Sequence, residues 1–141
     1  MAAFEKSIPA ADLSVFAKLV SAGAGAGEIE QSVREMVGDL GFITLAKINQ
    51  GPLVSRLGKS KKITTYLIGN PVLANRMYEE DPSTGLYAPL RVALYEDYAG
   101  VTHVTYDQPS SLLCQFANAN IRDVAQILDQ KMSGLAARLS Q

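Results

Sequence analysis

The residue best suited to chemistry in this sequence is its one histidine, His103. Histidine is the side chain whose ordinary pKa lies closest to neutrality, so His103 is the natural acid or base of a weak enzyme. The neighbouring sequence places no Ser, Cys or carboxylate where it would form a relay with this ring. We therefore favour a packed or surface histidine, and we keep a weak enzyme that uses His103 as an alternative function.

A small ligand would find several suitable groups along the same part of the chain. They would offer a charge, an aromatic wall, a donor that can switch and two orienting polar groups. The candidate ligand-binding residues are Arg91, Tyr95, His103, Asp107 and Asn70. A lone His or Tyr can also be an axial ligand, so a haem or metal-binding protein is a further alternative, although no dedicated motif is present. One Cys and one His cannot build a zinc site alone, so no metal ligands are predicted and the cofactor is left unknown.

The alternating glycines of the segment SAGAGAGEIEQ, residues 21–31, could begin a phosphate-binding loop. A dinucleotide loop needs a third glycine where Glu28 stands, and a carboxylate at that position would repel the phosphate. The segment is therefore interpreted as a flexible joint.

Three other groups also have a simple structural interpretation. The segment RLGKSKK, residues 56–62, has Leu53 where a phosphate loop requires glycine, so it is predicted to be a solvated turn before a strand. Cys114 lies in an apolar helical stretch and is predicted to be a buried, structural thiol. The carboxylates at 79–81 have no histidine beside them and are predicted to be a solvated helix end.

The composition describes one globular domain over residues 1–141, with 48% hydrophobic and 19% charged residues. A net charge of -1 argues against nucleic acid and anionic membrane surfaces, because both attract a basic surplus. The single cysteine fits a reducing cytoplasm. The sequence shows neither a secretory signal nor a long apolar stretch, so we expect a cytoplasmic protein with no membrane partner.

Four short segments rich in β-branched and aromatic residues predict strands over 42–48, 62–68, 90–96 and 101–106. Apolar residues at helical spacing predict helices over 9–20 and 27–40, with Pro9 in the first turn of one and Gly41 as the stop of the other. A strand is the competing interpretation of residues 9–22. Asn70 is expected to cap a short helix that begins at Pro71. A long C-terminal helix is expected to follow a cap at Asn120.

The segment EDYAGV predicts a hairpin between the last two strands, because Asp97 and Gly100 fit a type I turn with a glycine bulge. Its register places Tyr95 opposite His103. One face then carries apolar residues that helices must cover, namely Leu90, Val92, Leu94, Val104 and Tyr106. The other face carries Arg91, Ala93, Tyr95, His103, Thr105 and Asp107. This second face is too polar for a core and too aromatic for ordinary surface, and little chain remains to cover it. A partner subunit or a ligand is the expected cover.

The residues between 66 and 135 resemble a bacterial family called domain of unknown function 302. The resemblance rests on YLIGNPVLANRMYEEDPSTGLYAPLRVALYED, on VTYDQPSSLL and on the helical VAQILDQKM. It implies an α+β domain similar to the TATA-binding protein, with a curved antiparallel sheet of four to five strands backed by helices, and it implies dimers. It implies no catalytic residue. Residues 1–27 depart from the family pattern and are expected to be an N-terminal extension with the glycine joint, before a core over 28–141.

These features together predict a cytoplasmic, homodimeric domain. Its open sheet face is expected to bind a partner subunit, with a small ligand at the margin of that face.

Overall fold

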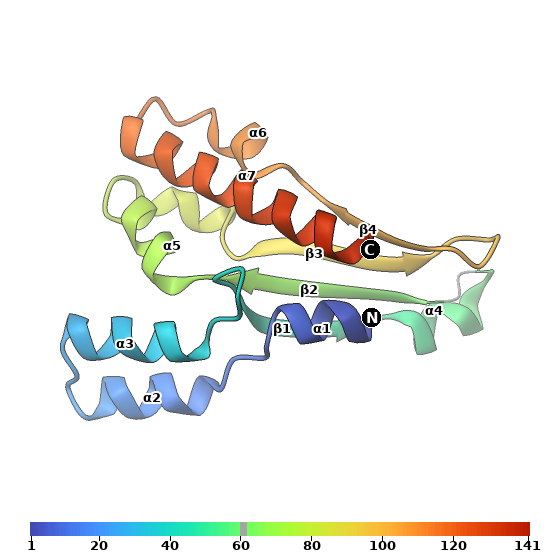
Figure 1. The fold of residues 1–141 in the computed structure, drawn as a ribbon, viewed down its shortest axis with the longest axis horizontal. Helices are drawn as coiled ribbons and strands as arrows, with labels where there is room; N and C mark the ends of the chain where they lie inside the picture. Colours follow the sequence, from blue (N-terminus) through green and yellow to red (C-terminus); the bar gives the residue numbers. More distant parts are fainter. Residues whose placement is uncertain (60–61) are drawn as a thin grey trace.

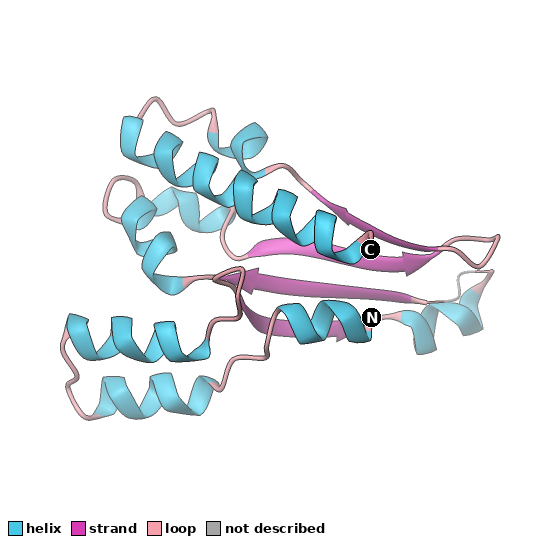
Figure 2. Cartoon of the chain, in the orientation of Figure 1, coloured by secondary structure: helices cyan, strands magenta, loops and turns pink. Residues whose placement is uncertain are grey.

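The computed structural model describes residues 1–59 and 62–141 as an α+β fold with an open, four-stranded antiparallel sheet. The strands are β1 (Ile43–Asn49), β2 (Ile63–Gly69), β3 (Leu90–Glu96) and β4 (Thr102–Tyr106), in chain order across the sheet. The helices are α1 (Ala2–Ser7), α2 (Leu13–Ser21), α3 (Ala26–Met36), α4 (Gly51–Leu57), α5 (Pro71–Tyr78), α6 (Pro109–Leu113) and α7 (Ala119–Leu139), with the 3₁₀-helix η1 (Pro82–Leu86). Figure 1 and Figure 2 show α1 and α7 lying across one face of the sheet. The predicted fold class is confirmed, and so are the four predicted strands.

The core lies between this covered face and α7. Successive strand residues point to opposite faces, so β2 buries Tyr66 and Ile68 while their neighbours remain partly exposed. The apolar stripe of α7 packs onto them through Ile121, Val124, Ala125, Leu128, Met132 and Leu135. Burial of this stripe is what stabilises the helix, since propensity alone contributes little. No helix within the described ranges is long and apolar enough to span a membrane.

The hairpin of β3 and β4 has the register that its turn predicts. Tyr95 pairs with His103, and Leu94 pairs with Val104. Gly100 has a φ of 84°, the left-handed conformation that a glycine bulge requires. The predicted division into two faces therefore holds, and the residues of β3 buried on the helix side are Leu90, Val92 and Leu94.

Helix α1 is a feature that the sequence did not predict. Phe4 and Ile8 are buried in the core, and the Phe4 ring lies 4.5 Å from the ring of Tyr66, centroid to centroid. The Tyr66 hydroxyl donates to Glu5 Oε1 at 2.8 Å, and Lys47 Nζ lies 2.6 Å from the same oxygen. Burial, and then the hydrogen bond to Glu5, raises the pKa of Tyr66 above its ordinary value. The first helix thus packs into the main core, and the division into an N-terminal extension and a core stays a prediction.

Residues 9–22 contain both of the structures that the sequence left open. Thr44 in β1 donates its backbone N–H to Pro9 and accepts one from Ala11, so this short piece lies extended along the edge of the sheet. The helix α2 begins only after Asp12, whose carboxylate accepts the N–H of Ser14. The prediction that Pro9 lies in the first turn of the helix is wrong, because Pro9 belongs to the extended piece and its carbonyl accepts the N–H of Thr44.

The glycine run connects α2 to α3, two helices rather than a strand and a helix. Gly23 has a φ of 70°, and Gly25 is the residue that precedes α3. The predicted stop of α3 at Gly41 is wrong, since the helix ends at Met36. The chain leaves the helix at Val37, which is extended, and the next N–H, that of Gly38, bonds to the carbonyl of Phe42 instead of to the helix. Gly38 also lies close to Ser7, because a Cβ at this position would be 2.6 Å from the Ser7 carbonyl oxygen.

Two further expectations about helix ends are corrected. The segment 51–57, part of which was predicted to be a turn, is the helix α4, while Ser60 and Lys61 of the predicted RLGKSKK turn lie outside the described residues. The cap of α7 is Asn118 rather than Asn120, because Asn118 Oδ1 accepts the N–H of Ile121. The amides of both asparagines donate to Glu80, which ties the end of α5 to the start of α7.

The prediction that Cys114 is buried is wrong, because the residue is exposed. Helix α6 is a single turn that buries Pro109 and Leu113, so the next residue points away from the core. The Cys114 thiol donates a hydrogen bond to the Ser111 carbonyl, at 3.3 Å.

This exposure predicts that Cys114 reacts with a thiol reagent in the native protein. We expect labelling at a rate similar to that of the urea-unfolded chain, because no packing blocks the sulfur. Stopped-flow absorbance with a disulfide reagent measures both rates. Slow labelling that accelerates on unfolding would show that the thiol is protected.

The packing of α1 predicts a large effect of Phe4→Ala. The free energy of unfolding should fall by about 3–5 kcal/mol, as for other buried aromatic truncations. Leu13→Ala is the matched control, because Leu13 on α2 is 53% exposed, and should change it by no more than about 0.5 kcal/mol. Urea unfolding followed by circular dichroism measures both, and equal effects would mean that α1 is not part of the core.

Candidate functional site

The candidate site is the open face of the sheet, the face opposite α1 and α7. Cross-strand pairing arranges its side chains in rows, such as Ile63, Tyr95 and His103. Its members are half-buried or exposed, and they are Ala46, Ile48, Ile63, Thr65, Leu67, Arg91, Ala93, Tyr95, His103 and Thr105. The face therefore presents aliphatic and aromatic groups that the chain's own helices do not bury.

Tyr95 and His103 form the aromatic centre of one end of this face. Their rings stack with centroids 5.1 Å apart and planes inclined by 21°. His103 Nε2 lies 2.7 Å from Asp97 Oδ2. The expectation that the neighbouring sequence places no carboxylate against this ring is therefore wrong. The signal was available, because Asp97 lies two residues after Tyr95 and therefore points to the same face.

Asp97 is positioned by the hairpin turn. Its Oδ1 accepts the backbone N–H groups of Ala99 and Val101, both at 2.9 Å, and its Oδ2 contacts His103. The hydrogen bond with His103, followed by the bond from the Val101 N–H, holds the pKa of Asp97 below its ordinary value. This geometry gives His103 a fixed orientation on the face. It is also what a purely structural turn needs, so catalysis by His103 stays a prediction.

Arg91 and Asp107 lie together at the other end of the hairpin. Arg91 Nη2 is 3.4 Å from Asp107 Oδ2, and the two side chains are 72% and 57% exposed. An ion pair this exposed contributes little to folding. Arg91 and Tyr95 are four positions apart along β3, which corresponds to about 13 Å, so the two groups do not share one small-ligand site within a single chain.

Asn70 does not join the other candidate residues. Its Oδ1 accepts the N–H groups of Val72 and Leu73 at the start of α5, as predicted, and its Nδ2 donates to the Gly41 carbonyl at 3.0 Å. The amide is thus used to hold α5 against the turn before β1. A ligand role for Asn70 would have to compete with these three bonds.

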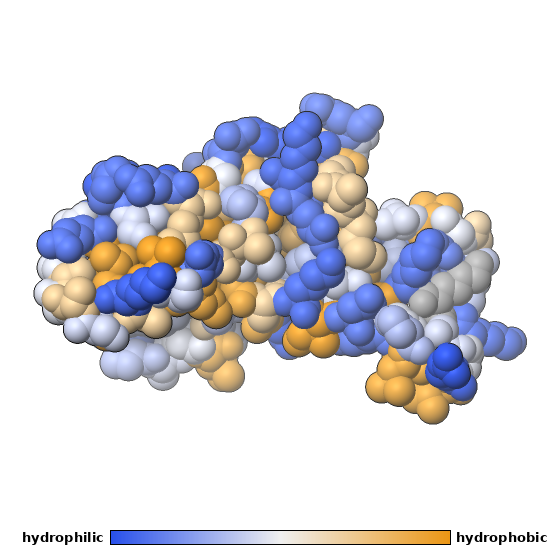
Figure 3. Space-filling model, turned by 90° about the horizontal axis from the view of Figure 1, so that it is seen from below, coloured by the Kyte–Doolittle hydropathy of each residue, from blue (hydrophilic) through white to orange (hydrophobic). Residues whose placement is uncertain are grey.

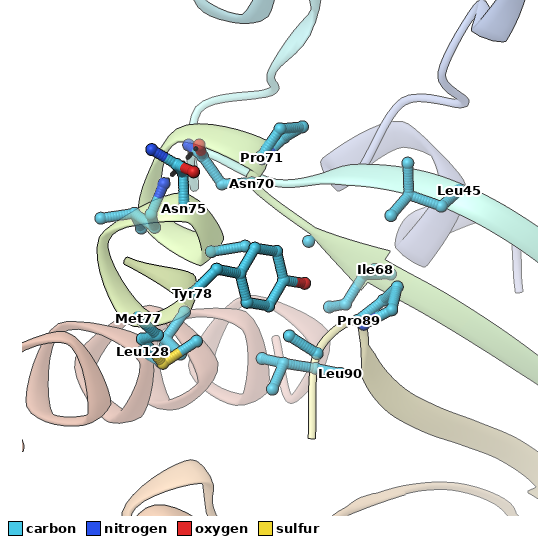
Figure 4. Close-up of a pocket in the computed structure, with 14 residues that line it drawn as sticks. Leu45, Ile68, Asn70, Pro71, Asn75, Met77, Tyr78, Pro89, Leu90 and Leu128 are labelled. Carbon is cyan, nitrogen blue, oxygen red and sulfur yellow. Dashed lines mark hydrogen bonds between the residues drawn. The ribbon is translucent and has the colours of Figure 1, made fainter. Parts of the chain in front are cut away.

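Two cavities border the segment 88–90, which leads into β3. One, of about 230 Å³, lies on the side of the open face and is bordered by Leu67, Arg91 and Asp107. The other, of about 350 Å³, lies between α5 and the ends of β2 and β3, and Figure 4 shows Tyr78 within it. Sequence reasoning did not anticipate the second cavity. Within the described ranges, no three His, Cys, Asp or Glu side chains are grouped so as to hold a metal ion.

The fold and site define a class of protein, an α+β domain whose sheet is backed by helices on one face and open on the other. Residues 17–139 match the family described as Domain of unknown function DUF302, and the chain belongs to that family. A similar solved structure is that of an uncharacterized conserved protein DUF302 from Bacillus stearothermophilus. It has 17% identity and a TM-score of 0.62, and the match covers 82% of this chain and 91% of that one. No curated protein gives a significant match.

The contact between His103 and Asp97 predicts a measurable change in acid titration. The folded pKa of Asp97 lies below its ordinary value of 3.8, so the ionised carboxylate stabilises the fold above that pH, and this contribution is lost as the pH falls through the lowered pKa. In His103→Gln the pKa of Asp97 should rise toward its ordinary value. An NMR titration of the Asp97 carboxyl carbon measures this directly, with Tyr98→Phe in the same turn as the control. An unchanged titration in His103→Gln would mean that the contact does not form in solution.

Proposed function

We propose that this chain is a homodimeric domain in which the open faces of two copies pack together, with a small ligand bound at the margin of the interface. The observation that carries the proposal is the uncovered sheet face with its half-buried Leu67, Tyr95 and His103. A sheet with apolar groups on both sides is stable when both sides are covered. The location proposed for this dimer is the cytoplasm, which the single cysteine of the sequence supports.

A second copy of the same chain is the partner that the charges of this face favour. In a twofold interface, residue i of one copy contacts residue j of the other, and the reverse contact is then made as well. The face carries both a cation, Arg91, and an anion, Asp107, and both are largely exposed. In a twofold dimer, Arg91 of each copy can therefore pair with Asp107 of the partner subunit, which gives two ion pairs. The net charge of -1 leaves little repulsion between two copies.

Further exposed apolar residues lie toward α4. Ile48 at the end of β1 is 48% exposed, and Leu53 and Leu57 on α4 are 67% and 79% exposed. Figure 3 shows apolar residues gathered at the right-hand end of the molecule, where α4 lies. Large apolar side chains gathered at one end of the surface are consistent with a protein interface there.

The margin of the face provides the place for a ligand. The cavity beside Arg91 and Asp107 measures about 230 Å³, with Leu67 and Leu112 among its apolar walls. This volume is small for a ligand site, and a second copy packed on the face would enlarge and close it. A charge pair beside apolar walls favours a small molecule with one charged end.

Tyr95→Glu tests the proposed interface. The substitution places an unpaired charge among apolar groups, so we expect the dimer dissociation constant to rise at least about tenfold. The helix-backed side should remain folded, because Tyr95 is not part of the core. Sedimentation velocity at matched concentrations measures the association, and circular dichroism measures the fold.

Val20→Glu is the matched control, because Val20 on α2 is 73% exposed and lies outside the open face. It should leave the sedimentation of the parent unchanged. An intact Tyr95→Glu variant that sediments as the parent does would show that the open face is ordinary solvent surface.

A further inference from the structure

The larger cavity forms where the sheet ends and α5 begins. β2 ends at Gly69, and the Asn70 cap starts α5 immediately, so the chain turns away from β3 within two residues. Leu128 of α7 and Leu90 of β3 border the space that remains, which measures about 350 Å³. Ordinary small-molecule sites begin at roughly this volume.

The walls of this cavity are almost entirely apolar. Figure 4 shows Leu45, Ile68, Pro71, Met77, Pro89 and Leu90 around it, and none of its lining residues is charged. Burying a charged ligand without a partner is strongly unfavourable, so the walls select against carboxylates, phosphates and amines. A mainly hydrocarbon ligand would be favoured by the apolar area that it buries.

The Tyr78 hydroxyl is a polar group in the cavity that is available for a ligand. Asn70 uses its amide for the helix cap and for Gly41, and the Asn75 amide donates to Glu79. Tyr78 is half-buried, and in the part of the chain that the structure describes its hydroxyl has no hydrogen-bond partner. Figure 4 shows the Tyr78 ring lying across the cavity, with its hydroxyl end toward Ile68 and Pro89.

From this geometry we infer that the cavity binds a neutral, mainly apolar small molecule carrying one hydrogen-bonding group, which pairs with the Tyr78 hydroxyl. The apolar walls supply the affinity, and the phenol orients the ligand. This site is separate from the open face, because none of the residues that form that face lines it. It therefore does not require the proposed dimer, although Ala88, Pro89 and Leu90 also border the smaller cavity at the margin of that face.

The test uses 2-naphthol, which is neutral at pH 7 and carries one hydroxyl on an apolar ring system. We expect saturable binding in a fluorescence titration, with amide shifts in NMR spectra confined to α5 and the facing ends of β2 and β3. Naphthalene should bind more weakly because it lacks the hydroxyl, and 2-naphthoate should bind at least about tenfold more weakly because its charge would be buried. Absence of saturable 2-naphthol binding, or 2-naphthoate binding as tight, would overturn the inference.

Two variants locate the ligand. Tyr78→Phe keeps the ring and removes the hydroxyl, so it should weaken 2-naphthol about fivefold and leave naphthalene unchanged. Ala74→Phe fills part of the cavity and should abolish both. Equal loss of 2-naphthol and naphthalene in a folded Tyr78→Phe variant would overturn the role of the hydroxyl. Tyr95→Glu should still bind 2-naphthol, so a failure of the dimer proposal and a failure of this site give different results.

Discussion

The structure depends on one constraint, namely that a sheet has two faces and the helices of this chain cover only one of them. Helices α1 and α7 bury Tyr66, Ile68 and Val92 on that side. The other side keeps its shape because the β strands are paired throughout and the β3–β4 turn is tied by Asp97. This face carries apolar groups without internal cover, and we propose that a partner covers it.

The same arrangement divides the polar residues of the open face into two groups. Stacking and the Asp97 contact give Tyr95 and His103 a defined orientation at the turn end. Arg91 and Asp107 form an exposed pair at the far end, beside a small cavity. The candidates therefore lie in two separate places, and in the proposed dimer both would be parts of one extended interface. The apolar cavity at Tyr78 belongs to a different region, where α5 leaves the sheet.

Local sequence signals predicted those parts of the fold that local physics determines. The Asp and Gly of DYAG fix the hairpin register, and the 3 and 4 spacing of apolar residues defines α7. Helix α1 gave no such signal, because it has six residues and its contact partner Tyr66 is about sixty positions away. The exposure of Cys114 depends on which side of a single turn packs inward, and periodicity over five residues does not determine that.

Part of the candidate site could also be predicted from the sequence. Strand alternation placed Arg91, Tyr95 and His103 on one face, and the same rule would have added Asp97. Asn70 was correctly identified as a helix cap, which is the reason that it does not serve the open face. The cavity at Tyr78 could not be found from the sequence, because its volume depends on how far α5 stands from the strands.

The most direct test of the central claim is the mass of the native, unmodified protein over a range of concentrations, by native mass spectrometry supported by sedimentation equilibrium. If a second copy covers the open face, the protein has twice its chain mass of 15.1 kDa at micromolar concentration and dissociates on dilution. A mass of 15.1 kDa at every concentration would contradict the account, because the apolar face would then be stable without any cover.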